Sequence, residues 1–213
     1  TKRLKDSFSK YLEITNQNPH YIGSKIFQFA IIFLAAAPAI SLFLLLSASI
    51  IGSFNRQNNF FKDKYNYPFI SVAILMVLNC LVITFSKNDL QSLEISKIWI
   101  GLLNWLPFFW CFWGFQPYLE SQQLRIKVAK LFIISSLPVL ISGFSQYFFK
   151  IYGPYNFFNN LIIWYQRPLG STDAVTGLFN NQNYAGAWLC IVFPLCLVFV
   201  SKNNNKFKKI LLF

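Results

Sequence analysis

A polar stretch from Arg167 to Asn183, rich in glycine and asparagine, contains the residues of this chain best suited to chemistry. Arg167 carries a planar guanidinium that can form two parallel hydrogen bonds to a phosphate. Asn180 and Asn183 offer donors and acceptors just before an apolar run, where the first backbone N–H groups of a helix can bind an anion. Gly170 and Gly177 permit backbone conformations that other residues resist. These residues form a candidate anion-binding site.

The same stretch also has a plain structural interpretation. Loops rich in asparagine and glycine are common, and a polar cluster before a helix can cap its N-terminus. An arginine beside an apolar run can also hold its charge at a membrane interface while its stem lies along apolar surface. From residue types alone, this interpretation is favoured over an anion-binding site.

The elements that must position this stretch are strongly apolar. The chain has 213 residues, of which 55% are hydrophobic and 12% charged, and its mean hydropathy is +0.44. A soluble domain carries about 25% charged residues. Several apolar runs free of Asp, Glu, Lys, Arg and His reach the ~20 residues that a membrane-spanning helix needs. We therefore predict an all-α, polytopic transmembrane helix bundle with about five to six membrane segments. The runs are Ile26–Ile51, Pro68–Phe85, Ile98–Tyr118, Leu131–Phe149 and Tyr184–Val200.

The distribution of basic residues predicts a topology. The net charge is +12, but lysines and arginines flank the apolar runs, which indicates lipid headgroups as partners and not nucleic acid. If every run crosses once, the two sides carry 9 and 10 basic residues, which assigns no orientation. A hairpin at Pro38 changes this to 15 and 4, a clear positive-inside bias. We expect a proline-centred hairpin at 26–51, with Arg167 outside; the alternative is one tilted helix kinked at Pro38.

Two further segments are expected at the membrane surface. Residues 1–24 predict a basic amphipathic helix, with Leu4 and Phe8 on its apolar face. Residues 155–166 place large apolar side chains on one helical face, which predicts an external interfacial helix. Prolines near the middle of four runs predict helix kinks: Pro38, Pro107, Pro138 and Pro194.

Nothing in the sequence predicts a metal site or a cofactor. The single histidine, His20, lies in the polar N-terminal segment without a second ligand beside it. The four cysteines lie in apolar runs without CxxC spacing, which is typical of small buried hydrophobic residues. The glycines do not cluster as a phosphate-binding loop or dinucleotide motif requires.

Two motifs give the chain a resemblance to a known family. Arg-Pro-Leu-Gly at 167–170 and Thr-Gly-Leu-Phe-Asn-Asn-Gln-Asn-Tyr-Ala-Gly at 176–186, followed by an apolar span, resemble the O-antigen ligase family. That family includes O-antigen polymerases and cyanobacterial members once linked to inorganic carbon uptake. Residues 136–147 are similar to the span that precedes this motif in the family. The resemblance covers roughly residues 98–200.

The resemblance implies a bacterial, multi-pass plasma-membrane glycosyltransferase that needs no metal ion. It would transfer a glycan from undecaprenyl diphosphate to an acceptor sugar on the outer side of the membrane. Arg167 would contact the diphosphate, with Gly170, Gly177, Asn180 and Asn183 around it.

Family members have about twice as many spans and a large external loop that carries further arginines and a histidine. In this chain only residues 202–213 follow the last long apolar run. We therefore expect the chain to be the N-terminal half of such an enzyme, inactive alone. The catalytic residues are expected downstream of Phe213.

Two other functions stay open. One is a transporter of bicarbonate or another small solute, although ion-coupled carriers usually keep ionisable residues within their spans. Here the notable polar groups are Asn79, Asn104 and Gln146, and such side chains can simply join helices by hydrogen bonds. The other is a non-catalytic membrane subunit that needs a second chain to supply the missing half.

Overall fold

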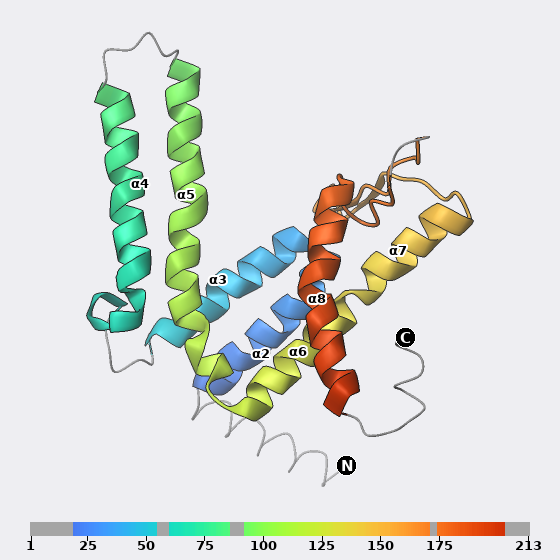
Figure 1. The fold of residues 1–213 in the computed structure, drawn as a ribbon, viewed down its shortest axis with the longest axis horizontal. Coiled ribbons are helices and arrows are strands. Elements are labelled where there is room, and N and C mark those ends of the chain that lie inside the picture. The colour runs from blue at the N-terminus through green and yellow to red at the C-terminus, as the bar shows by residue number, and fades with distance from the viewer. Residues whose placement is uncertain (1–18, 55–59, 86–91, 171–173, 203–213) are drawn as a thin grey trace. The chain divides into compact units, whose positions relative to one another are not determined.

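The computed structural model describes residues 19–54, 60–85, 92–170 and 174–202, which are mostly helical (Figure 1). The chain forms two compact units: the first contains Leu46–Tyr118 and the start of the first described helix, and the second contains Lys25–Leu45 and the residues after Tyr118. The predicted surface helix at 1–24 lies almost entirely outside the described residues. Only its last six residues are described, as the start of a helix that continues into the first apolar run.

The first apolar run folds into two helices, α2 (Pro19–Phe33) and α3 (Pro38–Phe54). Pro38 is the first residue of α3, where its fixed φ suits a helix start. The buried hydroxyl of Ser41 donates a hydrogen bond of 2.7 Å to the carbonyl oxygen of Ala30, so the chain turns back on itself. The proline-centred break is therefore confirmed. At 15 and 17 residues, the helices are about 23 and 26 Å long, less than the ~30 Å of a bilayer core.

The first unit is built on α4 (Tyr67–Phe85) and α5 (Ser92–Phe115), which run side by side (Figure 1). Short 3-10 turns precede α4 at Phe60–Lys62 (η1) and Lys64–Asn66 (η2), and Gln116–Leu119 (η3) follows α5. Gly114 of α5 lies against α3 so closely that a Cβ there would be 2.7 Å from the carbonyl oxygen of Ser49. Glycine is required at this contact because it lets the two backbones approach.

The second unit contains α6 (Gln122–Ser135), α7 (Leu137–Phe148) and α8 (Gln182–Lys202). Pro138 lies in the first turn of α7, so the apolar run at 131–149 divides into two helices where a kink was expected. Pro107 and Pro194 lie inside α5 and α8. The indole N–H of Trp188 donates to the hydroxyl of Ser136 at 3.0 Å, which joins α8 to the α6–α7 junction.

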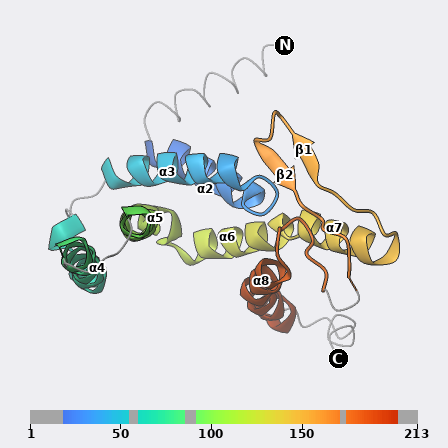
Figure 2. The same ribbon diagram turned by 90° about the horizontal axis from the view of Figure 1, so that it is seen from above.

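The interfacial helix predicted at 155–166 is wrong. These residues form an antiparallel hairpin of β1 (Tyr155–Phe157) and β2 (Ile162–Trp164), side by side in Figure 2. The turn between them contains three residues with positive φ, namely Phe158 (+51°), Asn159 (+53°) and Asn160 (+68°). Asparagine tolerates this left-handed region, in which a right-handed helix cannot continue. The short apolar runs on each side of the turn fit the periodicity of a helix as well as that of a strand. The left-handed turn between them is compatible with two strands and not with one helix.

Four described segments are long and apolar enough to cross a membrane: Lys64–Phe85, Ser96–Leu119, Gln122–Phe148 and Gln182–Val200. Together with the shorter apolar helices α2 and α3, they correspond to the apolar runs of the sequence. The structure thus agrees with an all-α fold that carries one small β-hairpin.

Candidate functional site

The five candidate residues all lie in the second unit, but only two of them line the same hollow. Arg167 and Asn180 line a polar hollow of about 220 Å³, here called the Arg167 hollow. Gly170 lines a neighbouring hollow of about 550 Å³ that also contains Lys150, here called the Lys150 hollow. The Arg167 hollow is completed by Pro168, Thr176, Asn181 and Gln182.

Gly177 and Asn183 are not in the lining of either hollow. Gly177 adopts a φ of +56°, and an added Cβ would lie 3.2 Å from the carbonyl oxygen of Val139. This position therefore favours glycine for both conformation and space. The backbone N–H of Asn183 donates to the side-chain oxygen of Asn181 at 2.8 Å, and that of Tyr184 donates to the Asn181 carbonyl at 3.2 Å. Asn181 therefore already binds two of the first N–H groups of α8, and these two are not open to an anion.

The backbone around Arg167 is held by the buried side chain of Gln146 on α7. Its amide nitrogen donates to the carbonyl oxygen of Arg167 and, at 3.1 Å, to the hydroxyl of Thr176. Its oxygen accepts from the backbone N–H groups of Thr176 and Gly177 at 3.1 and 3.0 Å. A primary amide has two donor hydrogens and two acceptor lone pairs, so Gln146 uses its full hydrogen-bonding capacity. One side chain therefore joins the described segments that end at residue 170 and begin at residue 174.

A second buried glutamine, Gln166, fixes the residue before Arg167. Its side-chain oxygen accepts from the hydroxyl of Ser142 at 2.8 Å, and its amide donates to the carbonyl oxygen of Ile151 at 2.7 Å. Its own carbonyl accepts from the N–H of Gly153 at 2.9 Å. Gln146 and Gln166 thus anchor the backbone on both sides of the Arg167 Cα, while the Arg167 residue itself is exposed.

An apolar slot of about 600 Å³ lies between α7 and α8, next to both polar hollows. It shares Gln182 with the Arg167 hollow, and it shares Tyr147, Ala174 and Val175 with the Lys150 hollow. Most of its lining is aliphatic or aromatic, with Phe144 among its residues. We call it the α7–α8 slot. A ligand with a polar head and a hydrocarbon chain could bind with its head in the hollows and its chain in the slot.

The electrostatic character of the two polar hollows is cationic. Arg167 lines one, and the ammonium of Lys150 lies 5.3 Å from the ring centroid of Tyr147 beside the other. Within the described residues, neither hollow is lined by Asp or Glu. Asp173, the nearest acid to Arg167 in sequence, is not among the residues that the structure describes. Nor do the described residues bring three potential metal ligands together.

The catalytic residues were expected downstream of Phe213, and this expectation stays a prediction. Phe213 itself belongs to residues 203–213, which lie outside the described part of the chain. The two hollows and the slot are therefore a candidate site for binding a substrate, and no residue that lines them is assigned a catalytic role.

Sequence reasoning identified Arg167 and Asn180 but missed the buried glutamines as the frame of the site. Gln146 was noted only as a polar group able to join helices, and Gln166 had no role. A usable signal exists on α7, where Val139, Ser142 and Gln146 share the buried face at helical spacing.

The fold and the site define a helical protein with four potential membrane spans and a cationic hollow beside an apolar slot. Comparison of the chain with protein-family models, curated proteins and solved structures finds no match.

Proposed function

We propose that this chain is part of a bacterial membrane glycosyltransferase of the O-antigen ligase kind, acting on a glycan carried by undecaprenyl diphosphate. The observation that carries the proposal is the α7–α8 slot beside two cationic hollows. A polyprenyl diphosphate has the same two parts, a long hydrocarbon chain and a multiply charged anion. The motifs at 167–170 and 176–186 support the same assignment by resemblance.

In the proposed reaction, Arg167 stabilises the charge on the departing diphosphate. The acceptor hydroxyl attacks the anomeric carbon of the glycan, a new C–O bond forms, and the bond to the diphosphate breaks. The departing diphosphate gains negative charge at the oxygen that it takes away. A fixed guanidinium stabilises this charge more in the transition state than in the substrate. Arg167 would supply that charge, while the group that accepts the hydroxyl proton is not assigned to a residue of this chain.

The proposed location is the plasma membrane, with the Arg167 hollow on its outer side. The hairpin of α2 and α3 supports this orientation, because it gives the two sides 15 and 4 basic residues. The proposed acceptor is a sugar or lipid on the outer side of the membrane. No metal ion or other cofactor is part of the proposal.

Binding of undecaprenyl diphosphate tests the proposal. The chain is placed in phosphatidylcholine nanodiscs and titrated with radiolabelled undecaprenyl diphosphate, with undecaprenol as the matched ligand that lacks the anion. Hydrogen bonds to charged groups contribute about 1.5–3 kcal/mol, so we expect the diphosphate to bind at least about tenfold more tightly.

Equal binding of the two lipids would contradict the proposal. Uptake of labelled bicarbonate into liposomes that contain the chain, without diphosphate binding, would favour the transporter instead. Copurification of a second chain that carries an external arginine- and histidine-rich loop, with no polyprenyl binding by this chain, would favour a non-catalytic subunit.

A further inference from the structure

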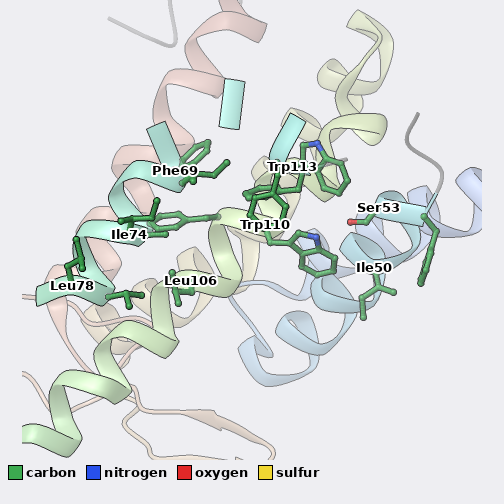
Figure 3. Close-up of a pocket in the computed structure, with 15 residues that line it drawn as sticks. Ile50, Ser53, Phe69, Ile74, Leu78, Leu106, Trp110 and Trp113 are labelled. Carbon is green, nitrogen blue, oxygen red and sulfur yellow. The ribbon is translucent and has the colours of Figure 1, made fainter. Parts of the chain in front are cut away.

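The first unit contains a groove that the proposed function does not use. It has a volume of about 950 Å³ and lies among α3, α4 and α5, with Phe60 and Phe61 of η1 at its edge. Figure 3 shows Ile74 and Leu78 of α4 on one side, Ile50 of α3 on the other, and the α5 side chains between them. The groove is therefore built from three helices and is not one exposed helix face.

The lining is apolar and aromatic. Trp110 and Trp113 of α5 contribute indole rings, and Phe69 of α4 lies 5.5 Å, between ring centroids, from Phe109. Ser53 is its one hydroxyl-bearing residue, and that hydroxyl donates to the Ser49 carbonyl at 2.7 Å. Apart from this hydroxyl and the indole N–H groups of the two tryptophans, the side chains of the lining are hydrocarbon, so the groove favours a hydrocarbon occupant over a polar one.

The depth of the groove matches one leaflet of a bilayer. Along α4 its lining extends from Phe69 to Leu78, a rise of about 14 Å at 1.5 Å per residue. Half of the ~30 Å hydrocarbon core is ~15 Å. Tyr65 and Tyr67 are exposed just before Phe69, at the level where tyrosines meet lipid headgroups. The groove thus begins at the interface expected from α4 and extends about one acyl chain deep.

The interfacial end of the groove is cationic. Lys62 directly follows the lining residue Phe61, Lys64 lies two residues further on, and both lysines are exposed. Asp63 lies between them and accepts a hydrogen bond from the N–H of Tyr65 at 3.1 Å, so the three residues carry one net positive charge. A protein helix that occupied the groove would need only its apolar walls. The positive charge at one end is an additional feature, and it matches the anionic headgroup of a lipid.

We propose that this groove binds an anionic phospholipid, with one acyl chain among α3, α4 and α5 and the headgroup at Lys62 and Lys64. The site is separate from the Arg167 hollow and binds bilayer lipid, not the glycan carrier. The bound lipid must have an acyl chain about one leaflet long and a negatively charged headgroup at the end of the groove next to the lysines.

Quenching of tryptophan fluorescence by brominated lipid tests this proposal, because Trp110 and Trp113 line the groove. The chain is placed in phosphatidylcholine nanodiscs that contain rising fractions of dibrominated phosphatidylglycerol or dibrominated phosphatidylcholine. We expect half-maximal quenching at an about fivefold lower fraction of phosphatidylglycerol, as one net charge near a headgroup predicts. Equal curves for the two lipids would overturn the proposal.

Two pairs of variants separate the acyl chain from the charge. Ala73→Phe fills the groove and should remove the quenching at low lipid fraction, whereas Val72→Phe, one residue away and outside the lining, should keep it. A Lys62→Gln/Lys64→Gln double variant should lose the preference for phosphatidylglycerol, and the control Lys97→Gln/Lys127→Gln should retain it.

Unchanged quenching in Ala73→Phe, or a retained preference in the Lys62→Gln/Lys64→Gln variant, contradicts the site. A dimer in native mass spectrometry that Ala73→Phe dissociates without any change in quenching identifies a second copy as the occupant and likewise overturns it.

Discussion

The Arg167→Ala variant should bind undecaprenyl diphosphate about 10–100-fold more weakly than the wild-type chain. Loss of a guanidinium that bonds a diphosphate removes roughly 1.5–3 kcal/mol, and each 1.4 kcal/mol is tenfold in the dissociation constant. The fold should be unaffected, because the hydrogen bonds of Arg167 to Gln146 and Thr176 use its backbone carbonyl and N–H, which alanine retains. Titration with the labelled lipid and the midpoint of thermal unfolding measure the two effects.

Two controls sharpen this result. Arg167→Lys keeps the charge but loses the planar fork, so its affinity should lie between those of the wild type and Arg167→Ala. Lys127→Ala removes one positive charge from an exposed position on α6 and should bind as the wild type does. Wild-type affinity in Arg167→Ala would remove this residue from the site.

Of the substitutions proposed for this chain, Gln146→Leu should cause the largest loss of folding stability. Leucine leaves the carbonyl of Arg167 and the N–H groups of Thr176 and Gly177 without their partner. Each unsatisfied buried group costs about 1–3 kcal/mol, so we expect at least about 3 kcal/mol. For a chain of this length that corresponds to a fall of roughly 6–12 °C in the midpoint of thermal unfolding, measured by circular dichroism in detergent.

Asn79→Leu is the matched control for Gln146→Leu, because it also removes an amide from an apolar helix, but at an exposed position. Its midpoint should stay within about 2 °C of the wild type, since exposed substitutions usually change stability by less than about 0.5 kcal/mol. Equal midpoints for Gln146→Leu and Asn79→Leu would show that the glutamine does not stabilise the loop.

These two substitutions act on different properties of the same site. Arg167→Ala should weaken ligand binding without lowering the unfolding midpoint, and Gln146→Leu should lower the midpoint and weaken binding as a consequence. The distinction follows from burial, because Gln146 has an exposed fraction of 0% whereas the Arg167 residue is exposed.

The helices could be predicted from the sequence because each is encoded locally. Apolar runs of about 20 residues predicted α4, α5 and α8, and the charge count predicted the break at Pro38. The β-hairpin at 155–164 was missed because its apolar residues fit a helical face as well as a strand. The left-handed turn at residues 158–160, which contains Asn159 and Asn160, distinguishes a hairpin from a helix.

The candidate site was less predictable because its frame is not local. Gln146 bonds residues 21 to 31 positions away, and Gln166 bonds Ser142 at a separation of 24. No sequence period encodes such pairs. The cap at the start of α8 was a different case, because Asn181 lies two residues before Asn183 and this spacing is typical of a local Asx turn. That local bond was available to sequence reasoning and was missed.

The most direct test of the proposed site is the proximity of Arg167 to a bound diphosphate. Solid-state NMR can transfer magnetisation between the guanidinium nitrogens of an arginine-labelled chain and the phosphorus nuclei of undecaprenyl diphosphate. The chain has four arginines, so a comparison with Arg167→Lys at saturating lipid assigns the signal. We predict a nitrogen–phosphorus signal in the wild type that disappears in Arg167→Lys. Bound lipid without that signal, or a signal that persists in Arg167→Lys, would contradict the role given to Arg167.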